Sequence, residues 1–307
     1  MRVVVTGANG FVGRHLVKEL ASHGLNVIGL AGSSDNKQFI QGYCEVIEIN
    51  LLNRAGLKAI SFKQVDQVIH LAGLASVGPS FNKPGEYLNT NAGMQINLFE
   101  EAIAQDTRPG FLIISSGSLY DPHDKLPLTE TSSVVPSSPY AVSKLVQEQF
   151  AAYYSNRGFN CVVARPFNHI GPGQSLGFIV PDLVSQVVNG GKDRHKKVLV
   201  GNLESKRDYT DVRDIARAYR LLAEKGKPGN IYNVCSGVAI SGNELLEKIT
   251  KQSGSKVEMV KDQALIRPSD NPIIYGSHKK LTKDTGWEPK IKLEQTLADV
   301  LEEWKKK

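Results

Sequence analysis

Short apolar runs alternate with longer amphipathic segments through the first half of the chain. Runs rich in β-branched residues predict strands at residues 2–6, 26–30, 45–49, 66–72, 111–116 and 160–165. Apolar positions at helical spacing predict helices at residues 11–23, 86–105 and 139–157. Strands and helices in alternation are typical of a parallel sheet with helices on both faces, joined by right-handed crossovers. The pattern therefore predicts an α/β fold built on a doubly wound parallel sheet.

The regular alternation ends after Arg165, where the stretch "RPFNHIGPGQ" combines glycines and prolines. Later helices are predicted near residues 178–190 and 291–305. We expect residues 1–165 to form one domain, completed by parts of 203–235, and residues 166–307 to form mainly a smaller C-terminal α/β lobe. No serine/glycine linker, internal repeat or low-complexity segment separates the two, so an extensive interface between them is expected.

The composition narrows the classes of function. The 307 residues are 41% hydrophobic, which is enough for a large core, and the net charge is +6. No basic stripe is interleaved with aromatic residues, so we expect no nucleic-acid partner. The apolar runs are far shorter than the roughly 20 residues of a membrane span, and the chain starts in a strand-like segment without a signal-peptide layout. We therefore expect a soluble cytoplasmic protein with no membrane partner.

Cysteine and histidine positions argue against metal and disulfide chemistry. Cys44, Cys161 and Cys235 are odd in number and widely spaced, so they are expected to be buried free thiols. None of the seven histidines pairs with another at the short spacing of a metal site, and we expect no metal.

The stretch "TGANGFVG" follows the first predicted strand and opens the first predicted helix. Gly7, Gly10 and Gly13 recur every three residues there. Glycines at this place permit a tight turn and a close approach of the backbone, and the free N–H groups at the helix start can bind a pyrophosphate. The context predicts a dinucleotide cofactor.

The end of the second strand distinguishes NAD from NADP. An acidic side chain there binds the ribose hydroxyls and repels a 2′-phosphate, but in "VIGLAGSS" this place is taken by Ala31. Asp35 can still fold back toward the ribose. The side chains that can receive a phosphate are Ser33, Ser34, Arg14 and Lys37. These residues favour NADP and leave NAD open.

The stretch "PYAVSK" places Lys144 four residues after Tyr140, on one face of a predicted helix. A nearby ammonium favours the phenolate and brings a phenol, whose ordinary pKa is about 10, closer to a value useful for proton transfer. Ser116 ends the preceding strand, where its hydroxyl can polarise a substrate carbonyl. A second pair, Tyr275 and Lys279, follows no glycine loop or strand-end serine, and we expect no catalytic role for it.

Together, "TGANGFVG", "HLAG", "SSGSLY" and "YAVSK", in this order, resemble the extended short-chain dehydrogenases/reductases, which include nucleotide-sugar epimerases, dehydratases and reductases. The resemblance implies a Rossmann-type cofactor domain with a smaller nucleotide-sugar lobe. It also implies that Ser116, Tyr140 and Lys144 are catalytic, that Lys144 binds the nicotinamide ribose, and that Asn91 supports the site. The implied cofactor-binding residues are Gly7, Gly10, Phe11, Val12, Gly13, Ala31, Ser33, Asn50, Leu51, Leu71, Ala72, Gly73, Tyr140 and Lys144.

The second half resembles one group within that family. "RPFNHIGPGQ", "GFIVPDLVSQV", "VGNLESKRDYTDVRDIARAY", "RPSDNPIIYGSHKKL" and "TGWEPKIKLEQTL" are similar to GDP-4-keto-6-deoxy-D-mannose reductases. This implies NAD(P)H-dependent reduction of the C4 keto group of a GDP-4-keto-6-deoxyhexose, for GDP-D-rhamnose or a related deoxysugar. The implied substrate-binding residues are Ser76, Ser118, Asn168, Gln174, Val180, Arg207, Arg267 and Asp270. Guanidinium groups suit a diphosphate, although Arg207 can instead pair with Asp208.

Several details refine this interpretation. Related dehydratases carry an acidic residue after the catalytic hydroxyl, whereas Gly117 and Ser118 follow Ser116, so net dehydration is not expected. Met94 stands where relatives usually have glycine, and no function is assigned to it. Asp211 and Asp214 are expected to begin a helix. His169 is left open between a structural and a functional role.

The sequence leaves three other functions open. A nucleotide-sugar 4-epimerase uses the same residues but regenerates its NAD within each cycle. A reductase can act on a dTDP-linked rather than a GDP-linked sugar, because base selection depends on lobe residues. A non-catalytic dinucleotide sensor would not need the complete set of serine, tyrosine and lysine. The family resemblance also implies a homodimer formed through the helices at 86–105 and 139–157.

Overall fold

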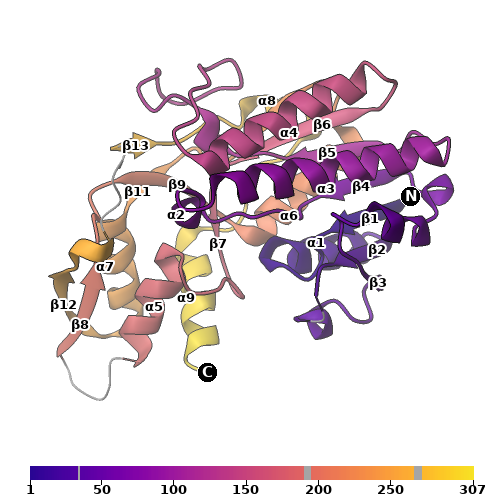
Figure 1. The fold of residues 1–307 in the computed structure, drawn as a ribbon. Helices are drawn as coiled ribbons and strands as arrows, with labels where there is room; N and C mark the ends of the chain where they lie inside the picture. Colours follow the sequence, from indigo (N-terminus) through magenta and orange to yellow (C-terminus); the bar gives the residue numbers. More distant parts are fainter. Residues whose placement is uncertain (34, 190–194, 266–271) are drawn as a thin grey trace.

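A seven-stranded parallel sheet forms the centre of the computed structural model, which describes residues 1–33, 35–189, 195–265 and 272–307 (Figure 1). The strand order is β10-β6-β5-β4-β1-β2-β3, and every neighbouring pair is parallel. The strands are β1 (Arg2–Thr6), β2 (Asn26–Ala31), β3 (Glu45–Glu48), β4 (Gln67–His70), β5 (Gly110–Ile114), β6 (Cys161–Pro166) and β10 (Ile231–Val234). The prediction of an α/β fold with a doubly wound parallel sheet is confirmed.

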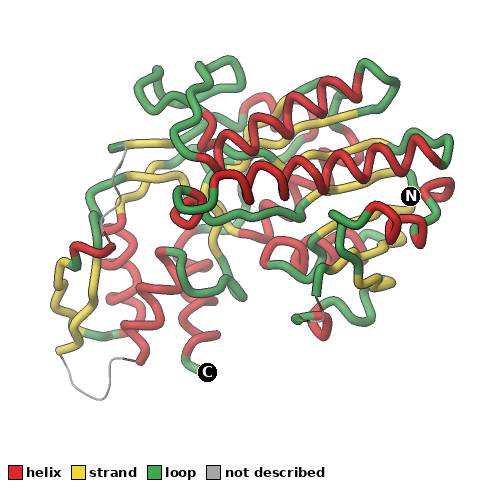
Figure 2. The backbone as a smooth tube through the Cα atoms, in the orientation of Figure 1, coloured by secondary structure: helices red, strands yellow, loops and turns green. Residues whose placement is uncertain are grey.

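Helices cover both faces of this sheet (red over yellow in Figure 2). One face packs against α1 (Phe11–Ser22), α6 (Val212–Lys225) and α8 (Lys279–Thr285). The other packs against α3 (Pro84–Ala104) and α4 (Pro139–Ser155), which lie side by side. Strand β5 shows why its sequence is apolar throughout: Leu112 and Ile114 join the first core, and Phe111 and Ile113 join the second. A parallel strand buried on both faces requires apolar residues at every position.

The C-terminal half adds a smaller lobe with its own hydrophobic core, drawn at the lower left of Figure 1. Its helices are α5 (Ile179–Asn189), α7 (Gly242–Ser253) and α9 (Leu293–Trp304). A four-stranded sheet contains β7 (Asn168–Ile170), β9 (Lys206–Asp211), β11 (Ala239–Ser241) and β13 (Ile273–Ile274), and β8 (His195–Val200) pairs with β12 (Lys256–Lys261). Short helical segments are α2 (Val77–Ser80), η1 (Lys37–Phe39), η2 (Arg54–Ala59), η3 (Phe62–Gln64), η4 (Gly117–Leu119) and η5 (Gln263–Leu265).

The large sheet takes strands from two parts of the chain. Strand β10 pairs with β6 at the edge of the sheet, although the segment between them in the sequence belongs partly to the lobe. Asp211 caps the start of α6 by accepting from the Arg213 N–H at 2.8 Å, and Asp214 lies in its first turn, as expected. Cys161 and Cys235 are buried free thiols, and Cys44 is partly exposed. Within the described ranges, no helix is both long and apolar enough to cross a bilayer. The division of the chain at residues 165 and 166 stays a prediction.

Candidate active site

The glycine-rich turn after β1 brings three chain segments into close contact. Gly7 has φ of +65°, and a Cβ on it would lie 3.1 Å from the Ala72 nitrogen. A Cβ on Gly13 would lie 2.1 Å from the Gly7 carbonyl oxygen, far inside contact distance. Gly10 precedes the first residue of α1, so the N–H groups of that helix start face the turn. This cradle, which side chains would fill, fits the pyrophosphate of a dinucleotide.

The loop after β4 lies between the glycine turn and the lysine of α4. The Ala72 N–H donates to Thr6 Oγ1 at 3.0 Å. A Cβ on Gly73 would lie 3.0 Å from Asn91 Oδ1 and 3.7 Å from Lys144 Nζ. The implied cofactor residues of this loop, with Leu71 before them, therefore lie at the same sheet edge as the glycine turn. In an α/β sheet this edge is where ligands bind.

The segment after β2 would face the adenosine ribose. Ala31 is fully buried, while Ser33 and Asp35 are exposed. Asn9 Nδ2 donates to the carbonyl oxygens of Ser33 (3.2 Å) and Asp35 (2.8 Å), and Ser33 Oγ lies 3.3 Å from Asp35 Oδ2. Ser34 lies outside the described residues. The carboxylate of Asp35 thus stands beside the exposed Ser33 hydroxyl.

Two other candidates for a phosphate contact already have partners. Lys37 Nζ lies 2.5 Å from Glu48 Oε2, and Arg14 Nη2 donates to the Gly173 carbonyl oxygen at 2.6 Å. Asn50 and Leu51, which follow β3, are also implied cofactor residues. Leu51 is buried, and its carbonyl oxygen accepts from Asn97 Nδ2 at 2.9 Å.

The first turn of α4 carries the expected catalytic tyrosine. Ser138 Oγ accepts from the Ala141 N–H at 3.1 Å and so caps the helix just before Pro139. Tyr140 is 9% exposed and Lys144 is 6% exposed. Lys144 Nζ donates to the Ile114 carbonyl oxygen at 2.8 Å and to Gln147 Oε1 at 2.9 Å, and it lies 6.0 Å from the Tyr140 ring centroid. The structure therefore brings this pair to the end of β5.

Ser116 completes the set at that strand end. Its Oγ accepts from the Ser118 N–H at 3.1 Å and lies 2.8 Å from Ser118 Oγ. Burial raises the pKa of Tyr140, the hydrogen bond with Ser116 lowers it in part, and Tyr87 raises it further. Burial also lowers the pKa of Lys144 to about 8, an effect that the charge of Glu148 opposes. The expected lowering of the Tyr140 pKa is absent here, because desolvation is the largest effect, and the phenol is protonated near neutral pH.

Asn91 connects the helices to the loop after β4. It is fully buried, its Oδ1 accepts from the Leu74 N–H at 2.8 Å, and its Nδ2 donates to Ser143 Oγ at 2.9 Å. Ser143 lies between Tyr140 and Lys144 on α4, so Asn91 holds that helix turn in place.

The sequence reasoning missed several polar residues around this site. His70, at the end of β4, bonds Thr6 Oγ1 through Nδ1 at 2.8 Å. Burial, and then the charge of Lys144, lowers the pKa of His70 to about 3. His70 is part of the "HLAG" motif, which was a usable signal. Gln147, Glu148 and Arg165 were also missed, and the signal was their polarity in otherwise buried elements.

The implied substrate residues come from several separate segments of the chain. Ser76 precedes α2, and its carbonyl oxygen accepts from Tyr87 Oη at 2.7 Å. Asn168 is exposed at the start of β7, and Arg207 lies on the neighbouring β9, where it donates to the Lys206 carbonyl oxygen at 2.9 Å. Arg267 and Asp270 lie outside the described residues.

Two further implied residues are buried. Val180 is fully buried in the core of the lobe. Gln174 is 7% exposed and donates to the His169 carbonyl oxygen at 3.1 Å. Burial lowers the pKa of His169, whose ring stacks on Phe11 with centroids 6.1 Å apart. These contacts favour the structural role for His169.

The structure bears on two other pairs that the sequence singled out, Arg207 with Asp208 and Tyr275 with Lys279. The Asp208 carboxylate accepts from the Ser236 N–H at 2.7 Å and from the Gly237 N–H at 2.9 Å, so it holds that turn. Tyr275 precedes α8, whereas Lys279 is its first residue, so the pair does not share a helix face.

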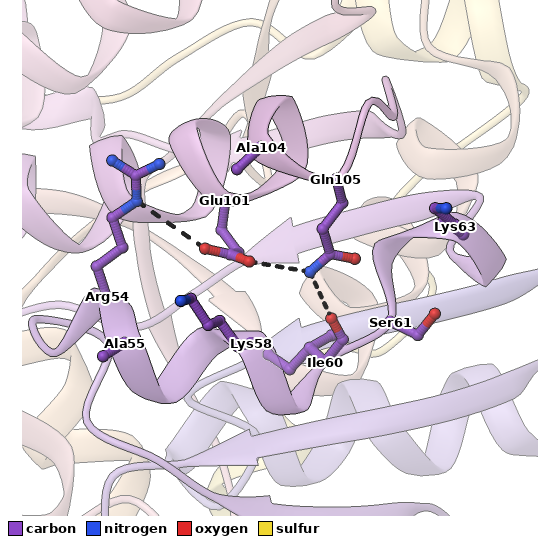
Figure 3. A pocket seen from close by; sticks show the side chains of 9 residues that line it. All are labelled: Arg54, Ala55, Lys58, Ile60, Ser61, Lys63, Glu101, Ala104 and Gln105. Atoms are coloured by element: carbon purple, nitrogen blue, oxygen red, sulfur yellow. Dashed lines mark hydrogen bonds and ion pairs between the residues drawn. The ribbon is translucent and has the colours of Figure 1, made fainter.

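A cavity of about 840 Å³ lies apart from this site, between η2 and α3 (Figure 3). Arg54, Lys58 and Lys63 line it together with the buried Glu101. Gln105 Nε2 donates to Glu101 Oε1 at 3.1 Å and to the Ile60 carbonyl oxygen at 2.9 Å. Its lining contains none of the residues of the glycine turn and none of Ser116, Tyr140 and Lys144.

Comparisons with known proteins agree with this geometry. Residues 3–235 match the NAD dependent epimerase/dehydratase family. The chain is 34% identical to GDP-6-deoxy-D-mannose reductase of Pseudomonas aeruginosa, over 99% of this chain and 97% of the relative. The structure of RMD from Pseudomonas aeruginosa complexed with NADPH matches with a TM-score of 0.86 at 33% identity, covering 99% of each chain.

A second solved structure is a UDP-glucose 4-epimerase with UDP-glucose from Thermotoga maritima. It matches with a TM-score of 0.90 at 28% identity, covering 100% of this chain and 99% of that one. The resemblance to extended short-chain dehydrogenases/reductases is confirmed, and so is the prediction of an NAD(P)-dependent oxidoreductase. The chain belongs to the NAD-dependent epimerase/dehydratase family.

Proposed function

We propose that this protein reduces the C4 keto group of a GDP-4-keto-6-deoxyhexose with NADPH or NADH, in the synthesis of GDP-D-rhamnose or a related deoxysugar. The observation that carries the proposal is the buried Tyr140 phenol, with the ammonium of Lys144 6.0 Å from its ring centroid and Ser116 at the adjoining end of β5. A protonated phenol at a strand end is suited to protonate a developing alkoxide. The substrate class is supported by full-length similarity to GDP-6-deoxy-D-mannose reductase.

The residues of the chain divide the work as follows. When bound, the reduced nicotinamide supplies a hydride. Tyr140 donates its phenolic proton to the C4 oxygen, and Ser116 donates a hydrogen bond to the same oxygen as negative charge develops there. Lys144 stabilises the phenolate that remains and binds the nicotinamide ribose. Asn91 and Ser143 keep that helix turn in register.

The lobe, residues 166–307, binds the nucleotide sugar in this proposal. Asn168 and Arg207 contact it from adjacent strands, and Arg267 and Asp270 belong to the same proposed set. We further propose a cytoplasmic homodimer formed through α3 and α4. Leu88 is 37% exposed and Val142 is 43% exposed on these helices, which supports an apolar contact there.

The test is cofactor oxidation by purified protein. GDP-4-keto-6-deoxymannose is prepared in situ from GDP-mannose, and the loss of absorbance of NADPH and of NADH is followed separately. Stoichiometric oxidation is expected, and the rate ratio identifies the preferred cofactor. Cofactor binding without oxidation would contradict the proposal and favour the dTDP-linked keto sugar.

A 4-epimerase is the second candidate, favoured by the TM-score of 0.90 with the Thermotoga maritima enzyme. An epimerase regenerates its NAD in each cycle, so net oxidation of added NADPH or NADH separates the two functions. A dehydratase is not supported, because Gly117 and Ser118 follow Ser116 where an acid would be needed.

A further inference from the structure

Helix α4 carries a buried carboxylate one turn after Lys144. Glu148 is 6% exposed, and both of its oxygens are engaged. Ser115 Oγ donates to Oε1 at 2.5 Å, and Arg165 donates to Oε1 through Nε at 2.8 Å and to Oε2 through Nη2 at 2.6 Å. Arg165 is itself only 3% exposed, at the end of β6. A bidentate ion pair is thus buried directly below the catalytic helix turn.

This ion pair shares its strand end with the catalytic residues. Lys144 binds the carbonyl oxygen of Ile114, and Glu148 binds the side chain of Ser115, the next residue. Ser116, which follows, carries the proposed catalytic hydroxyl. Two side chains one helical turn apart therefore hold two consecutive residues of one strand end. This arrangement fixes the position of α4 against the end of β5, and therefore the position of Tyr140 relative to Ser116.

Stability alone does not account for the pair. Removing two charges from water costs several kcal/mol per ion, and a buried ion pair is often no more stabilising than apolar residues of similar volume. The charge of Glu148 does bear on the active site, since it opposes the lowering of the Lys144 pKa by burial. The acceptors of Lys144, the Ile114 carbonyl oxygen and Gln147, are neutral, so Glu148 adds a negative charge that further favours its ammonium form.

We propose that Glu148, held by Ser115 and Arg165, is a positioning residue that keeps Lys144 charged and holds the start of α4 against the end of β5. This inference rests on the proposed function, because it assigns Glu148 to the reaction at Tyr140. Glu148 reaches the substrate only through Lys144 and the helix, so its effect is expected in the pH dependence of turnover.

The kinetic test uses Glu148→Gln, which preserves size and one acceptor oxygen but removes the charge. The alkaline limb of the kcat profile with NADPH and the keto sugar is expected to move down by about one pH unit or more. The matched control is Glu101→Gln, another buried carboxylate, which lies in the separate cavity and should leave the limb in place. An unmoved limb in Glu148→Gln would overturn the proposal.

A second variant covers the case in which Glu148→Gln does not fold, since it leaves Arg165 buried without its partner. The double variant Glu148→Gln with Arg165→Gln carries no uncompensated charge. The alkaline limb of its kcat profile is expected at a pH between those of the wild type and Glu148→Gln. If only the double variant folds, its alkaline limb is expected at a lower pH than that of the wild type. A limb at the wild-type position would count against the proposal.

A direct measurement separates this inference from the proposed function. Lysine side chains are labelled with ¹³C, and the Lys144 resonance is identified by its absence in Lys144→Arg. Its titration midpoint, measured without substrate, is expected to fall in Glu148→Gln and to stay constant in Glu101→Gln. If the wild type fails to oxidise cofactor but the midpoint falls, the proposed reaction is wrong and the charge coupling is right. Equal midpoints in wild type and Glu148→Gln would refute the coupling itself.

Discussion

The ammonium of Lys144 lies 6.0 Å from the centroid of the Tyr140 ring, one helical turn away on α4. It does not lie against the phenol oxygen as a simple ion pair would. The ammonium donates to the Ile114 carbonyl oxygen and to Gln147 Oε1. In the proposed reaction we therefore expect Lys144 to act on Tyr140 through its electrostatic field, because electrostatic interactions in a buried site are weakly screened. The proposed reaction requires the phenol to stay protonated until negative charge develops on the substrate.

Removing the phenolic hydroxyl tests the proposed role of Tyr140 as the proton donor. Tyr140→Phe should bind cofactor and nucleotide sugar but lose about 10²- to 10⁴-fold in kcat, because the proton donor is gone while the ring still packs. Steady-state turnover and cofactor fluorescence titration measure the two quantities. Tyr153→Phe is the matched control on the same helix, since Tyr153 is 51% exposed. Full activity in Tyr140→Phe would rule out its catalytic role.

The glycine turn predicts a position-specific loss of cofactor binding. Gly13→Ala would place a Cβ 2.1 Å from the Gly7 carbonyl oxygen, so the turn must shift. We expect a loss of stability of about 1–3 kcal/mol and at least a roughly tenfold weaker affinity for NADPH. Gly85→Ala is the control, because its Cβ would meet no atom within 4 Å. That change should be neutral or stabilise by up to about 1 kcal/mol. Unaltered binding in Gly13→Ala would mean that the cofactor lies elsewhere.

Asp35 is expected to influence the choice of cofactor. Its carboxylate lies 3.3 Å from Ser33 Oγ after β2, where it can repel a 2′-phosphate or bind ribose hydroxyls. Asp35→Asn should therefore raise the ratio of kcat/KM for NADPH to that for NADH, whichever cofactor the wild type prefers. Asp66→Asn, just before β4, should leave the ratio constant. An unchanged ratio in Asp35→Asn would place the adenosine ribose away from this segment.

The spacing of apolar residues and the residue types at the strand ends were enough to predict the large sheet. Runs such as "FLII" are buried on both faces, and glycine spacing located the turn that is proposed to bind the cofactor. The lobe was less predictable, because β7, β9 and β13 are two to six residues long and pair across many intervening residues. Short strands carry little periodicity, so their pairing depends on tertiary contacts that local sequence does not encode.

The side-chain contacts of the site show the same limit. Tyr140, Lys144 and Ser116 could be predicted, because their spacing and order carry the chemistry. The partners of Glu148 could not, because Ser115 and Arg165 come from two strands that meet α4 only in the folded chain. Arg14 was a reasonable candidate for a phosphate contact, but its guanidinium binds the carbonyl oxygen of Gly173, far along the chain.

His70 predicts a specific loss of stability in acid. Its pKa in the folded protein is about 3, below the ordinary value of 6.5, because the ring is buried and faces the charge of Lys144. Above that ordinary value both states hold a neutral ring, and the pH has no effect through this group. As the pH falls below it, the unfolded chain gains a proton that the folded protein does not. The free energy of unfolding should then fall by up to about 1.4 kcal/mol per pH unit, until the pH reaches the folded pKa.

The measurement is urea unfolding of the wild type and of His70→Asn between about pH 7 and about pH 5. Asparagine can replace the Nδ1 contact with Thr6 but does not titrate, so the variant is expected to be less stable at neutral pH and to lose less stability in acid. The difference between the two proteins should therefore narrow as the pH falls. His123→Asn, at an exposed histidine, should follow the wild-type curve. Parallel curves for wild type and His70→Asn would mean that the folded protein protonates His70 as readily as the unfolded chain does, and that burial and the charge of Lys144 do not lower its pKa.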